Sequence, residues 1–434
     1  MSFTKKIKTL AVVLAVAATA SAQFNGVDNA RTRALNGAPL GDISDIHSYP
    51  VLMMEYLNQA QITWNGTDEA PAGGSIIATK SLLDGMLGLG IITNRMSMAD
   101  ARFQSTVGTE LSGINPPVVP HILIGANLGM LKAGLDLFIE HNGYSATVST
   151  SNADNSVSTN DTTNSAMLFG TRLSANADLG MMDLLVKFGI GFPSLNRKAT
   201  GPSAGGGIET TEEKLKSGLY LEIGAEVSSN IAGIVDLTIG GGYTSMSHQL
   251  ADQVTPASTT VRPVNTSSLL SIYLSAEANV LETVAAVVGY EIINDVSKTL
   301  SSATAGTPPV TTETTARSGT FIHAFFAGLE GSWDNVWWKF DNLKLRSGIN
   351  YTIATPTSKT SNNQNSAGHE RSEFATHAFA DPTIGIGVSK GLLTIDAALN
   401  FGRLIENEDS DVFWENRGLL NGPTFGSVSA TFRF

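Results

Sequence analysis

Seven histidines have the widest chemical range of the residues in this sequence, because an imidazole can act as a base or as a metal ligand near neutral pH. No two of them have the close spacing of a His-x-x-x-His metal site. Two of them have a serine nearby in the sequence, but no catalytic motif joins these residues. We therefore expect no enzymatic activity, no bound metal and no cofactor. The seven are His47, His121, His141, His248, His323, His369 and His377.

Charged side chains between alternating apolar residues are the second candidate for function. Their positions predict that they line the interior of a water-filled barrel. Acids and bases facing each other across such a lumen create a transverse field, and an excess of acids favours cations. The alternative is that these charges pair with one another and stabilise the barrel interior. The predicted lumen residues are Asp136, Glu140, Arg172, Lys187, Glu222, Glu226, Asp236, Glu277, Glu291, Lys344, Arg346 and Asp396.

Strands have to position these charges, and the sequence alternates apolar and polar residues in the way that strands require. Leu219, Leu221 and Ile223 share one face of a predicted strand, while Glu222 and Glu226 share the other. Similar alternation recurs almost to the end of the chain. A period of two residues is typical of a β-strand and not of a helix.

The predicted connections between strands are short and long in turn. We expect short turns near 129–130, 179–180, 228–232, 280–283, 333–336 and 389–391. Long segments rich in Ser, Thr, Asn and Gly are predicted to be loops: 147–164, 193–214, 249–265, 297–313, 355–370 and 406–421. Short turns on one side and long loops on the other are typical of a bacterial outer-membrane β-barrel.

We therefore predict an all-β fold, a transmembrane antiparallel β-barrel. Strands of about 10 residues or more match a tilted crossing of the bilayer, and closure leaves no unpaired backbone edge in lipid. Sixteen candidate strands lie between residues 57 and 434. The first three, at 57–65, 73–80 and 86–95, have the weakest pattern, so 14 strands is the alternative. Aromatic residues at strand ends, such as Trp64 and Tyr290, are candidates for girdles at the membrane interfaces.

The first 22 residues have the features of a cleaved secretory signal peptide. Lys5, Lys6 and Lys8 form a positive region, an apolar stretch follows, and Ala20-Ser21-Ala22 offers small residues at a cleavage site. The apolar stretch is too short to span a bilayer, which takes about 20 apolar residues. We expect residues 1–22 to be removed on export to the outer membrane of a Gram-negative bacterium.

The last residues alternate in the same way and end on an aromatic ring. Val428, Ala430, Phe432 and Phe434 share one face of the final predicted strand. This strand resembles the C-terminal recognition strand of bacterial outer-membrane proteins. The resemblance implies that the barrel-assembly machinery is a partner and reads the strand that ends on Phe434.

Residues 23–56 do not alternate, and they are assigned to a separate N-terminal segment before a barrel of residues 57–434. The stretch from Ala30 to Ala38, followed by Asp42 to Pro50, resembles the N-terminal segment of FadL-type and PorV-type outer-membrane transport proteins. It departs from that pattern because Tyr49 precedes Pro50 where Asn is expected, and Val51 replaces Ala. The resemblance implies a plug folded into the lumen. The alternative is a periplasmic leader.

Composition narrows the remaining classes of function. The sequence has no cysteine, which excludes a disulfide framework, zinc held by cysteine and thiol catalysis. Its net charge is -12 and no basic patch is visible, which argues against nucleic-acid binding. The partners we expect are outer-membrane lipid and lipopolysaccharide, together with small solutes.

Three functions remain compatible with these patterns. A porin-like channel for passive diffusion of small solutes is the main hypothesis, and it predicts an open lumen with charged walls. A FadL-like conduit for hydrophobic molecules is the alternative, and it requires an apolar pocket near the N-terminal segment, for instance around Val51, Leu52, Met53 and Met54. A structural or surface-interaction protein without transport is the third.

Overall fold

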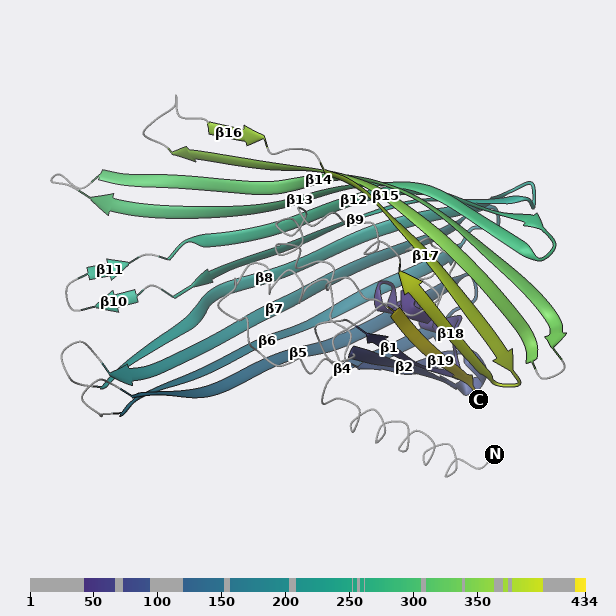
Figure 1. Cartoon of the computed structure of the whole chain (residues 1–434), viewed down its shortest axis with the longest axis horizontal. Coiled ribbons are helices and arrows are strands. Elements are labelled where there is room, and N and C mark those ends of the chain that lie inside the picture. Colours follow the sequence, from purple (N-terminus) through teal and green to yellow (C-terminus); the bar gives the residue numbers. More distant parts are fainter. Residues whose placement is uncertain are drawn as a thin grey trace.

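The chain forms a closed antiparallel β-barrel (Figure 1). The computed structural model describes residues 43–66, 73–93, 120–151, 157–202, 208–251, 253–255, 258–260, 262–305, 310–337, 340–362, 370–373, 377–400 and 426–434. The predicted signal peptide at 1–22 and the predicted loop at 406–421 lie outside these residues.

Closure comes from the first and last strands. β1 (Gln59–Gly66) pairs with β2 (Gly73–Leu82) on one side and with β19 (Gly426–Arg433) on the other. β16 (Glu370–Glu373) and β17 (His377–Lys390) both pair with β15 and occupy one position in the wall. The described residues thus make a barrel of 16 strands, which confirms the fold predicted from the alternation.

The other strands of the wall follow in chain order, and a separate two-stranded hairpin stands beyond β9. The wall strands are β3 (Leu87–Thr93), β4 (Pro120–Asn127), β5 (Leu131–Ser151), β6 (Val157–Asp178), β7 (Asp183–Pro202), β8 (Ile208–Ile231), β9 (Val235–Leu250), β12 (Val264–Leu281), β13 (Val284–Ala305), β14 (Val310–Trp337), β15 (Phe340–Asn362) and β18 (Leu393–Asn400). The hairpin consists of β10 (Gln253–Thr255) and β11 (Ser258–Thr260).

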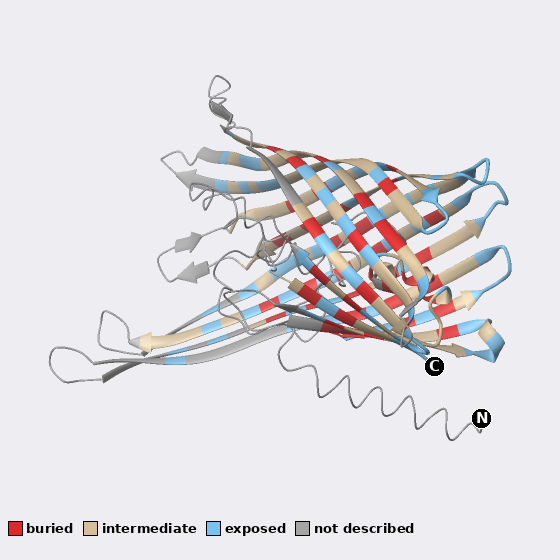
Figure 2. Ribbon diagram, turned by 45° about the vertical axis from the view of Figure 1, so that its right-hand side comes forward, coloured by how far each residue is buried: buried red, intermediate tan, exposed pale blue. Residues whose placement is uncertain are grey.

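The two faces of the wall differ as the alternation predicts. Ile124, Leu173 and Ile223 point outward and are exposed, whereas Arg172 and Glu222 point inward and are buried. Buried and exposed positions alternate along the strands in Figure 2. An exposed apolar outer face of this kind suits lipid and not water. Among the described residues, no helix is long and apolar enough to cross a membrane.

The strands are longer at one end of the barrel than the sequence predicts. Most of 147–164, 193–214 and 297–313, predicted as loops, belongs to the paired strands β5 to β8, β13 and β14. These loop predictions were wrong because these segments are mostly polar on both faces, with only single apolar residues such as Leu195 and Leu300. Apolar alternation disappears beyond the apolar belt, although the backbone ladder continues. We call this end of the barrel the long-loop end.

The opposite end, called here the short-turn end, has tight connections and carries the C-terminus (Figure 1). Gly129, Gly180, Gly233 and Gly391 have positive φ angles between +57° and +86°. Glycine adopts this left-handed conformation without steric cost. Each lies in or beside a turn predicted from the sequence.

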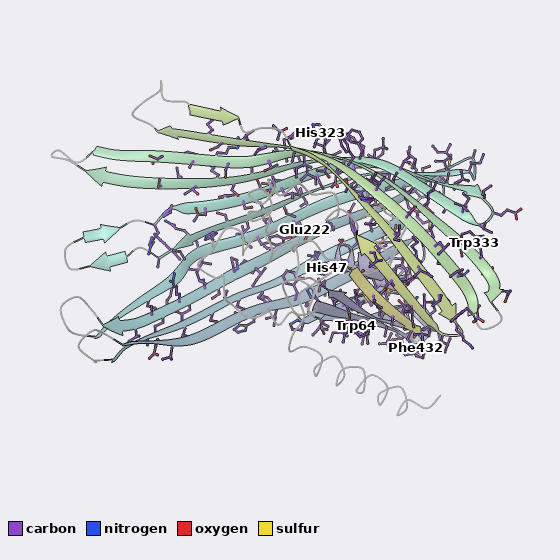
Figure 3. All side chains as sticks on the ribbon, in the orientation of Figure 1. His47, Trp64, Glu222, His323, Trp333 and Phe432 are labelled. Atoms are coloured by element: carbon purple, nitrogen blue, oxygen red, sulfur yellow. The ribbon has the colours of Figure 1, made fainter. Side chains whose placement is uncertain are left out.

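The described part of the N-terminal segment packs against the inner face of the wall. It contains two short 3₁₀ helices, η1 (Ile43–His47) and η2 (Pro50–Met54). η2 contacts β3, β4, β5 and β6. Ile46, Val51 and Met53 are fully buried there. Figure 3 labels His47 within the barrel, where its ring centre lies 5.3 Å from that of His121.

Candidate functional site

A row of small residues on neighbouring strands forms the seat of η2. Gly88 of β3 pairs with Gly125 of β4, which pairs with Gly134 of β5, and Gly134 pairs with Ser174 of β6. Because directly paired residues point to the same face, the four positions make one strip across the inner wall. We call Gly88, Gly125, Gly134 and Ser174 the glycine seat.

The segment lies so close to the glycine seat that a side chain would not fit. A Cβ atom added at Gly134 would lie 2.2 Å from the backbone nitrogen of Val51 and 2.5 Å from the carbonyl carbon of Pro50. At Gly125 it would lie 2.4 Å from Sδ of Met54. Gly134 therefore accommodates the backbone of η2 directly, which only glycine permits at such distances, whereas Gly88 and Gly125 make room for side chains of the segment.

Two polar contacts fix the segment on the seat. The backbone N–H of Val51 donates a hydrogen bond of 2.7 Å to Oγ of Ser174, in a buried position. Near the end of the segment, Nζ of Lys132 lies 3.3 Å from a carboxylate oxygen of Glu55. The Ser174 bond satisfies a backbone donor that has been removed from water, which would otherwise cost about 1–3 kcal/mol.

A buried charged cluster adjoins the seat, with Arg172 at its centre. The guanidinium of Arg172 donates to Glu222 at 2.9 Å, to Asp136 at 3.3 Å and to the backbone carbonyl of His47 at 2.6 Å. Nδ1 of His121 lies 2.9 Å from the Asp136 carboxylate. These contacts, with Lys187 of β7 bound to Glu222, join the five wall strands β4 to β8 to the N-terminal segment. We call His121, Asp136, Arg172, Lys187 and Glu222 the Arg172 cluster.

Tyr49 connects the segment to a second side of the same cluster. Nζ of Lys187 lies 2.6 Å from Glu222 and 4.8 Å from the centre of the Tyr49 ring. A cation over an aromatic face is attracted by the ring quadrupole. Burial, together with Glu226 and Glu222, raises the pKa of Tyr49 well above its usual range, so its hydroxyl stays neutral. Tyr49 stands where the FadL-type pattern has Asn. Its ring contacts the ammonium group of Lys187.

Apolar side chains surround the other side of the segment. Ile43, Ile46 and Met53 of the segment pack with inward-facing Ile77 and Leu123 of the wall. Leu52, Met54, Tyr56 and Leu57 pack around this group. The segment therefore packs on the wall through an apolar core, at the place where the hydrophobic-conduit hypothesis expects apolar residues.

A second apolar group faces inward closer to the long-loop end. It consists of Phe138, Ala166, Leu168, Leu195, Tyr220 and Met246, which come from β5 to β9. Phe138 connects it to the Arg172 cluster, because its ring lies 5.4 Å from that of His121 and 5.7 Å from the Arg172 guanidinium. Apolar surface thus lies on both sides of the buried charges.

A separate charged group stands on the strands nearer the C-terminus. Nε of Arg346 donates to Glu330 at 2.6 Å and its Nη1 donates to Asp396 at 2.5 Å, while Lys344 lies 3.3 Å from Glu330. Arg346 is 4 % exposed. These four charges neutralise one another and tie β14, β15 and β18 together.

The predicted lumen residues whose side chains the structure describes lie on the inward face of their strands, and many of them are buried and paired. Asp136, Arg172, Lys187 and Glu222 meet in the Arg172 cluster, and Lys344, Arg346 and Asp396 meet in the second group. Tyr273 donates to Glu226, and Glu277 and Glu291 are half-buried on β12 and β13. Asp236 is exposed near the short turn after β8 and accepts from Asn230 at 2.7 Å. The side chain of Glu140 lies outside the described residues.

Sequence reasoning missed the residues that hold the segment. The glycine seat was not identified, nor were His121, Ser174 and Glu330. A usable signal was present for two of them, because Gly125 and Gly134 occupy positions of inward parity on either side of the predicted turn at 129–130. Recognising them as a set requires the register between strands, which a single sequence does not provide.

Two other features bear on catalysis. The string Gly201-Pro202-Ser203-Ala204-Gly205 has the spacing of a hydrolase nucleophile elbow. That elbow joins a strand to a helix, whereas this string begins with the last two residues of β7 and the next strand is β8, with Ser203 outside the described residues. Within the described ranges, no three His, Asp or Glu residues are grouped so as to hold a metal ion.

Comparison with known proteins finds similarity among solved structures only. No family model matches the sequence, and no curated protein matches it. The toluene transporter TodX of Pseudomonas putida is similar at 10 % identity and a TM-score of 0.37, over 95 % of this chain and 100 % of that one. The toluene transporter TbuX of Ralstonia pickettii is similar at 11 % identity and a TM-score of 0.38, over 95 % and 99 %.

A receptor is similar as well. The ferric yersiniabactin uptake receptor FyuA of Yersinia pestis has 11 % identity and a TM-score of 0.38, over 79 % of this chain and 60 % of that one. At such values the likeness does not extend to function or substrate. The chain is a closed antiparallel barrel of 16 strands, as its own strand pairing among the described residues shows.

Proposed function

We propose that this chain is an outer-membrane transport protein, not an enzyme, that carries small hydrophobic molecules through a barrel holding its N-terminal segment as a plug. The observation that carries the proposal is the apolar group formed by Ile43, Ile46 and Met53 with Ile77 and Leu123 on the inner wall. An interior that serves only water-soluble solutes has no need of apolar surface at this depth.

The inward-facing apolar residues of β5 to β9 support the same route. Phe138, Leu168 and Tyr220 are at most 1 % exposed, and they lie between the Arg172 cluster and the long-loop end. Pockets for small apolar ligands are lined mainly by such side chains, with a few polar groups that fix orientation. Inward-facing apolar side chains therefore continue from the long-loop side towards the plug.

The charged residues argue against the main hypothesis of an open porin. A porin presents its charges to water, where they act on passing ions. Here Asp136, Arg172 and Glu222 are each at most 2 % exposed and are paired with one another. This arrangement matches the alternative of pairing within the interior, so the hydrophobic conduit is the better-supported function.

Export and assembly complete the proposal. We place the short-turn end in the periplasm, because both the N-terminal segment and the C-terminus lie towards that side and even-stranded barrels return both ends there. Cleavage of residues 1–22 on export and recognition of the strand ending on Phe434 by the barrel-assembly machinery belong to this placement. Lipid and lipopolysaccharide are the surroundings in which the outer face would lie.

Uptake by intact cells tests the function. The full chain is expressed in a Gram-negative host, and uptake of radiolabelled toluene and of a small sugar is measured side by side. Toluene is the first molecule to try, since it is apolar and small. We expect toluene uptake to increase several-fold and sugar uptake to stay at the background of the host.

Two methionines provide a matched pair of variants. Met54→Gln keeps the side-chain volume but places an amide in the apolar group beside Gly125, so we expect uptake of toluene to fall several-fold. Met181→Gln changes a residue that is 84 % exposed at the turn after β6, so uptake should not change. Increased sugar uptake without increased toluene uptake would refute the proposal.

A further inference from the structure

Cations stand side by side on three neighbouring strands near the long-loop end. Lys298 of β13 pairs in register with Arg317 of β14, and Arg317 pairs with Lys359 of β15. Arg371 of β16 continues the register beside Lys359. Like charges directly opposite each other destabilise a sheet. A row of this kind is therefore unfavourable unless an anion compensates it.

Among the side chains that the structure describes, no acid stands in register with the row, and the side chain of Glu373, on the same face of β16, lies outside them. No carboxylate among the described residues forms an ion pair with Lys298, Arg317 or Lys359. The nearest acid on this face of β14, Glu313, stands four residues further from the apolar belt. By contrast, Lys198 on the outer face of β7 is paired in register with Glu212 of β8. Lys198 therefore has an acid opposite it on the neighbouring strand, whereas each cation of the row has another cation opposite it.

These cations point outward, away from the lumen. Residues two apart on a strand share a face, so Arg317 lies on the same face as the exposed rings of Phe321 and Phe325. Lys298 likewise shares the face of Tyr290, and Lys359 that of Tyr351. All three cations are exposed.

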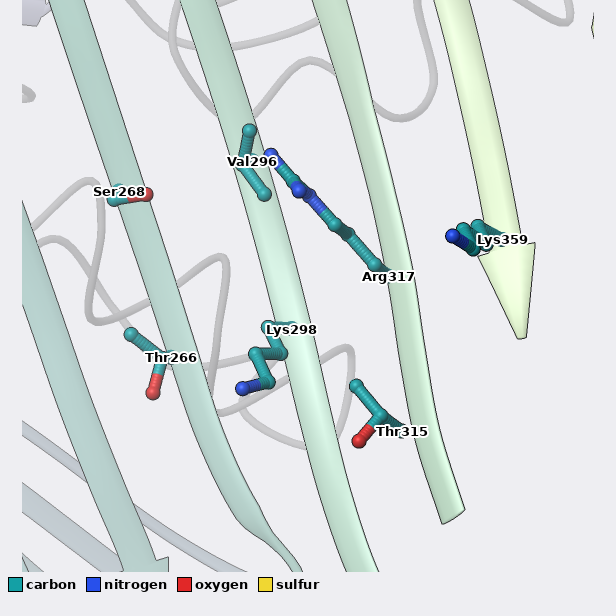
Figure 4. Close-up of a pocket in the computed structure, with 7 residues that line it drawn as sticks. All are labelled: Thr266, Ser268, Val296, Lys298, Thr315, Arg317 and Lys359. Carbon is teal, nitrogen blue, oxygen red and sulfur yellow. The ribbon is translucent and has the colours of Figure 1, made fainter. Parts of the chain in front are cut away.

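A hollow of about 400 Å³ lies between the cations (Figure 4). Thr266, Ser268 and Thr315 bring hydroxyl groups to it, and Val296 adds an apolar surface. Lysine and arginine with nearby hydroxyl donors are the groups that bind phosphate oxygens. We call this feature the cationic hollow.

The distance between the cationic hollow and the apolar belt, measured along the barrel axis, indicates which layer of the membrane surrounds the hollow. Arg317 stands four residues beyond Phe321, the last exposed ring on its face of β14. At a rise of roughly 3.3 Å per residue and a strand tilt of about 40°, Arg317 lies about 10 Å beyond Phe321 along the barrel axis. That is the level of lipid headgroups.

We infer that the cationic hollow binds the phosphate groups of an anionic lipid headgroup in the outer leaflet. The inference rests on the proposed placement of the long-loop end at the cell surface. It concerns the outer face only, and the transported molecule takes no part in it. Direct binding of one lipid to the hollow would also neutralise the row of like charges.

Native mass spectrometry of the refolded full barrel in detergent tests the inference. Diphosphorylated lipid A is the probe. Each cation near an anionic surface contributes a factor of roughly five. We expect Arg317→Gln to weaken lipid A binding about 5-fold and the triple variant Lys298→Gln, Arg317→Gln, Lys359→Gln to weaken it roughly 100-fold. Lys198→Gln removes one outward charge elsewhere at the same end and should leave binding unchanged.

Three results would overturn the inference. The first is equal binding by Arg317→Gln and Lys198→Gln barrels that keep normal heat-modifiable gel mobility. The second is equal binding of dephosphorylated lipid A. The third is full displacement of lipid A by millimolar inorganic phosphate, which would indicate a site for the free anion. Toluene uptake by the triple variant is expected to stay normal, so failure of this inference and failure of the proposed function are distinguishable.

Discussion

Substituting Gly134 by alanine should loosen the N-terminal segment without changing the barrel. The added Cβ would lie 2.2 Å from the nitrogen of Val51 and 2.5 Å from its Cα, both of which are backbone atoms. Ordinary van der Waals contact begins at 3.4 Å, so η2 has to move by about 1 Å. The hydrogen bond from Val51 to Ser174 would be stretched at the same time.

The magnitude follows from the cost of overpacking. Inserting a methyl group into a well-packed interior costs about 1–3 kcal/mol. Most of that cost falls on the seated state, because the strand ladder on both sides of Gly134 stays intact. Since 1.4 kcal/mol corresponds to a factor of ten, the population of unseated segment should rise roughly 5- to 100-fold.

Thiol labelling measures this population, because the natural chain has no cysteine. Val51→Cys places a thiol at a fully buried position of the segment. In the otherwise unchanged chain we expect slow reaction with a water-soluble maleimide, and in the Gly134→Ala background a rate roughly 5- to 100-fold higher.

Gly242→Ala is the matched control for this experiment. Gly242 is another strand glycine, and an added Cβ there would meet only the carbonyl oxygen of Ile223 at 3.4 Å. It should leave the labelling rate unchanged. Equal rates in the Gly134→Ala and Gly242→Ala backgrounds would refute the view that the glycine seat holds the segment.

Two further substitutions test the faces of β6. Arg172→Met should lower the free energy of unfolding by about 3–5 kcal/mol, because Glu222 and Asp136 lose their shared buried partner. Urea unfolding from vesicles measures this change. A change below about 1 kcal/mol would contradict the view that Arg172 holds the cluster together. Leu173→Arg, at the next residue and 52 % exposed on the outer face, should cost about 2–4 kcal/mol because it places a charge in lipid; a neutral effect would mean that Leu173 does not face the membrane.

The barrel was predictable from sequence because its signal is local. An apolar residue at every second position, as in Leu219, Leu221 and Ile223, fixes both the strand and its outer face without knowledge of the neighbours. The signal ends where both faces are mostly polar. For this reason 193–214 was predicted as a loop although most of it is strand.

The site was less predictable because it depends on contacts between distant parts of the chain. Alternation places Arg172 and Glu222 on the inward face, but only the register across β6, β7 and β8 brings them within 2.9 Å. From the sequence, the inward charges could either line a water-filled lumen or pair with one another. Only the folded barrel shows that they pair. The role of Gly134 depends on a segment that precedes it by more than 80 residues.

Single-channel recording in a planar bilayer tests the central claim most directly. If the refolded mature barrel carries hydrophobic molecules past a seated N-terminal segment, it should insert and fold, as heat-modifiable gel mobility would show, yet give no stable open steps of ionic current. Large, persistent and discrete conductance steps from the unmodified chain would show an open water-filled pore and contradict the account.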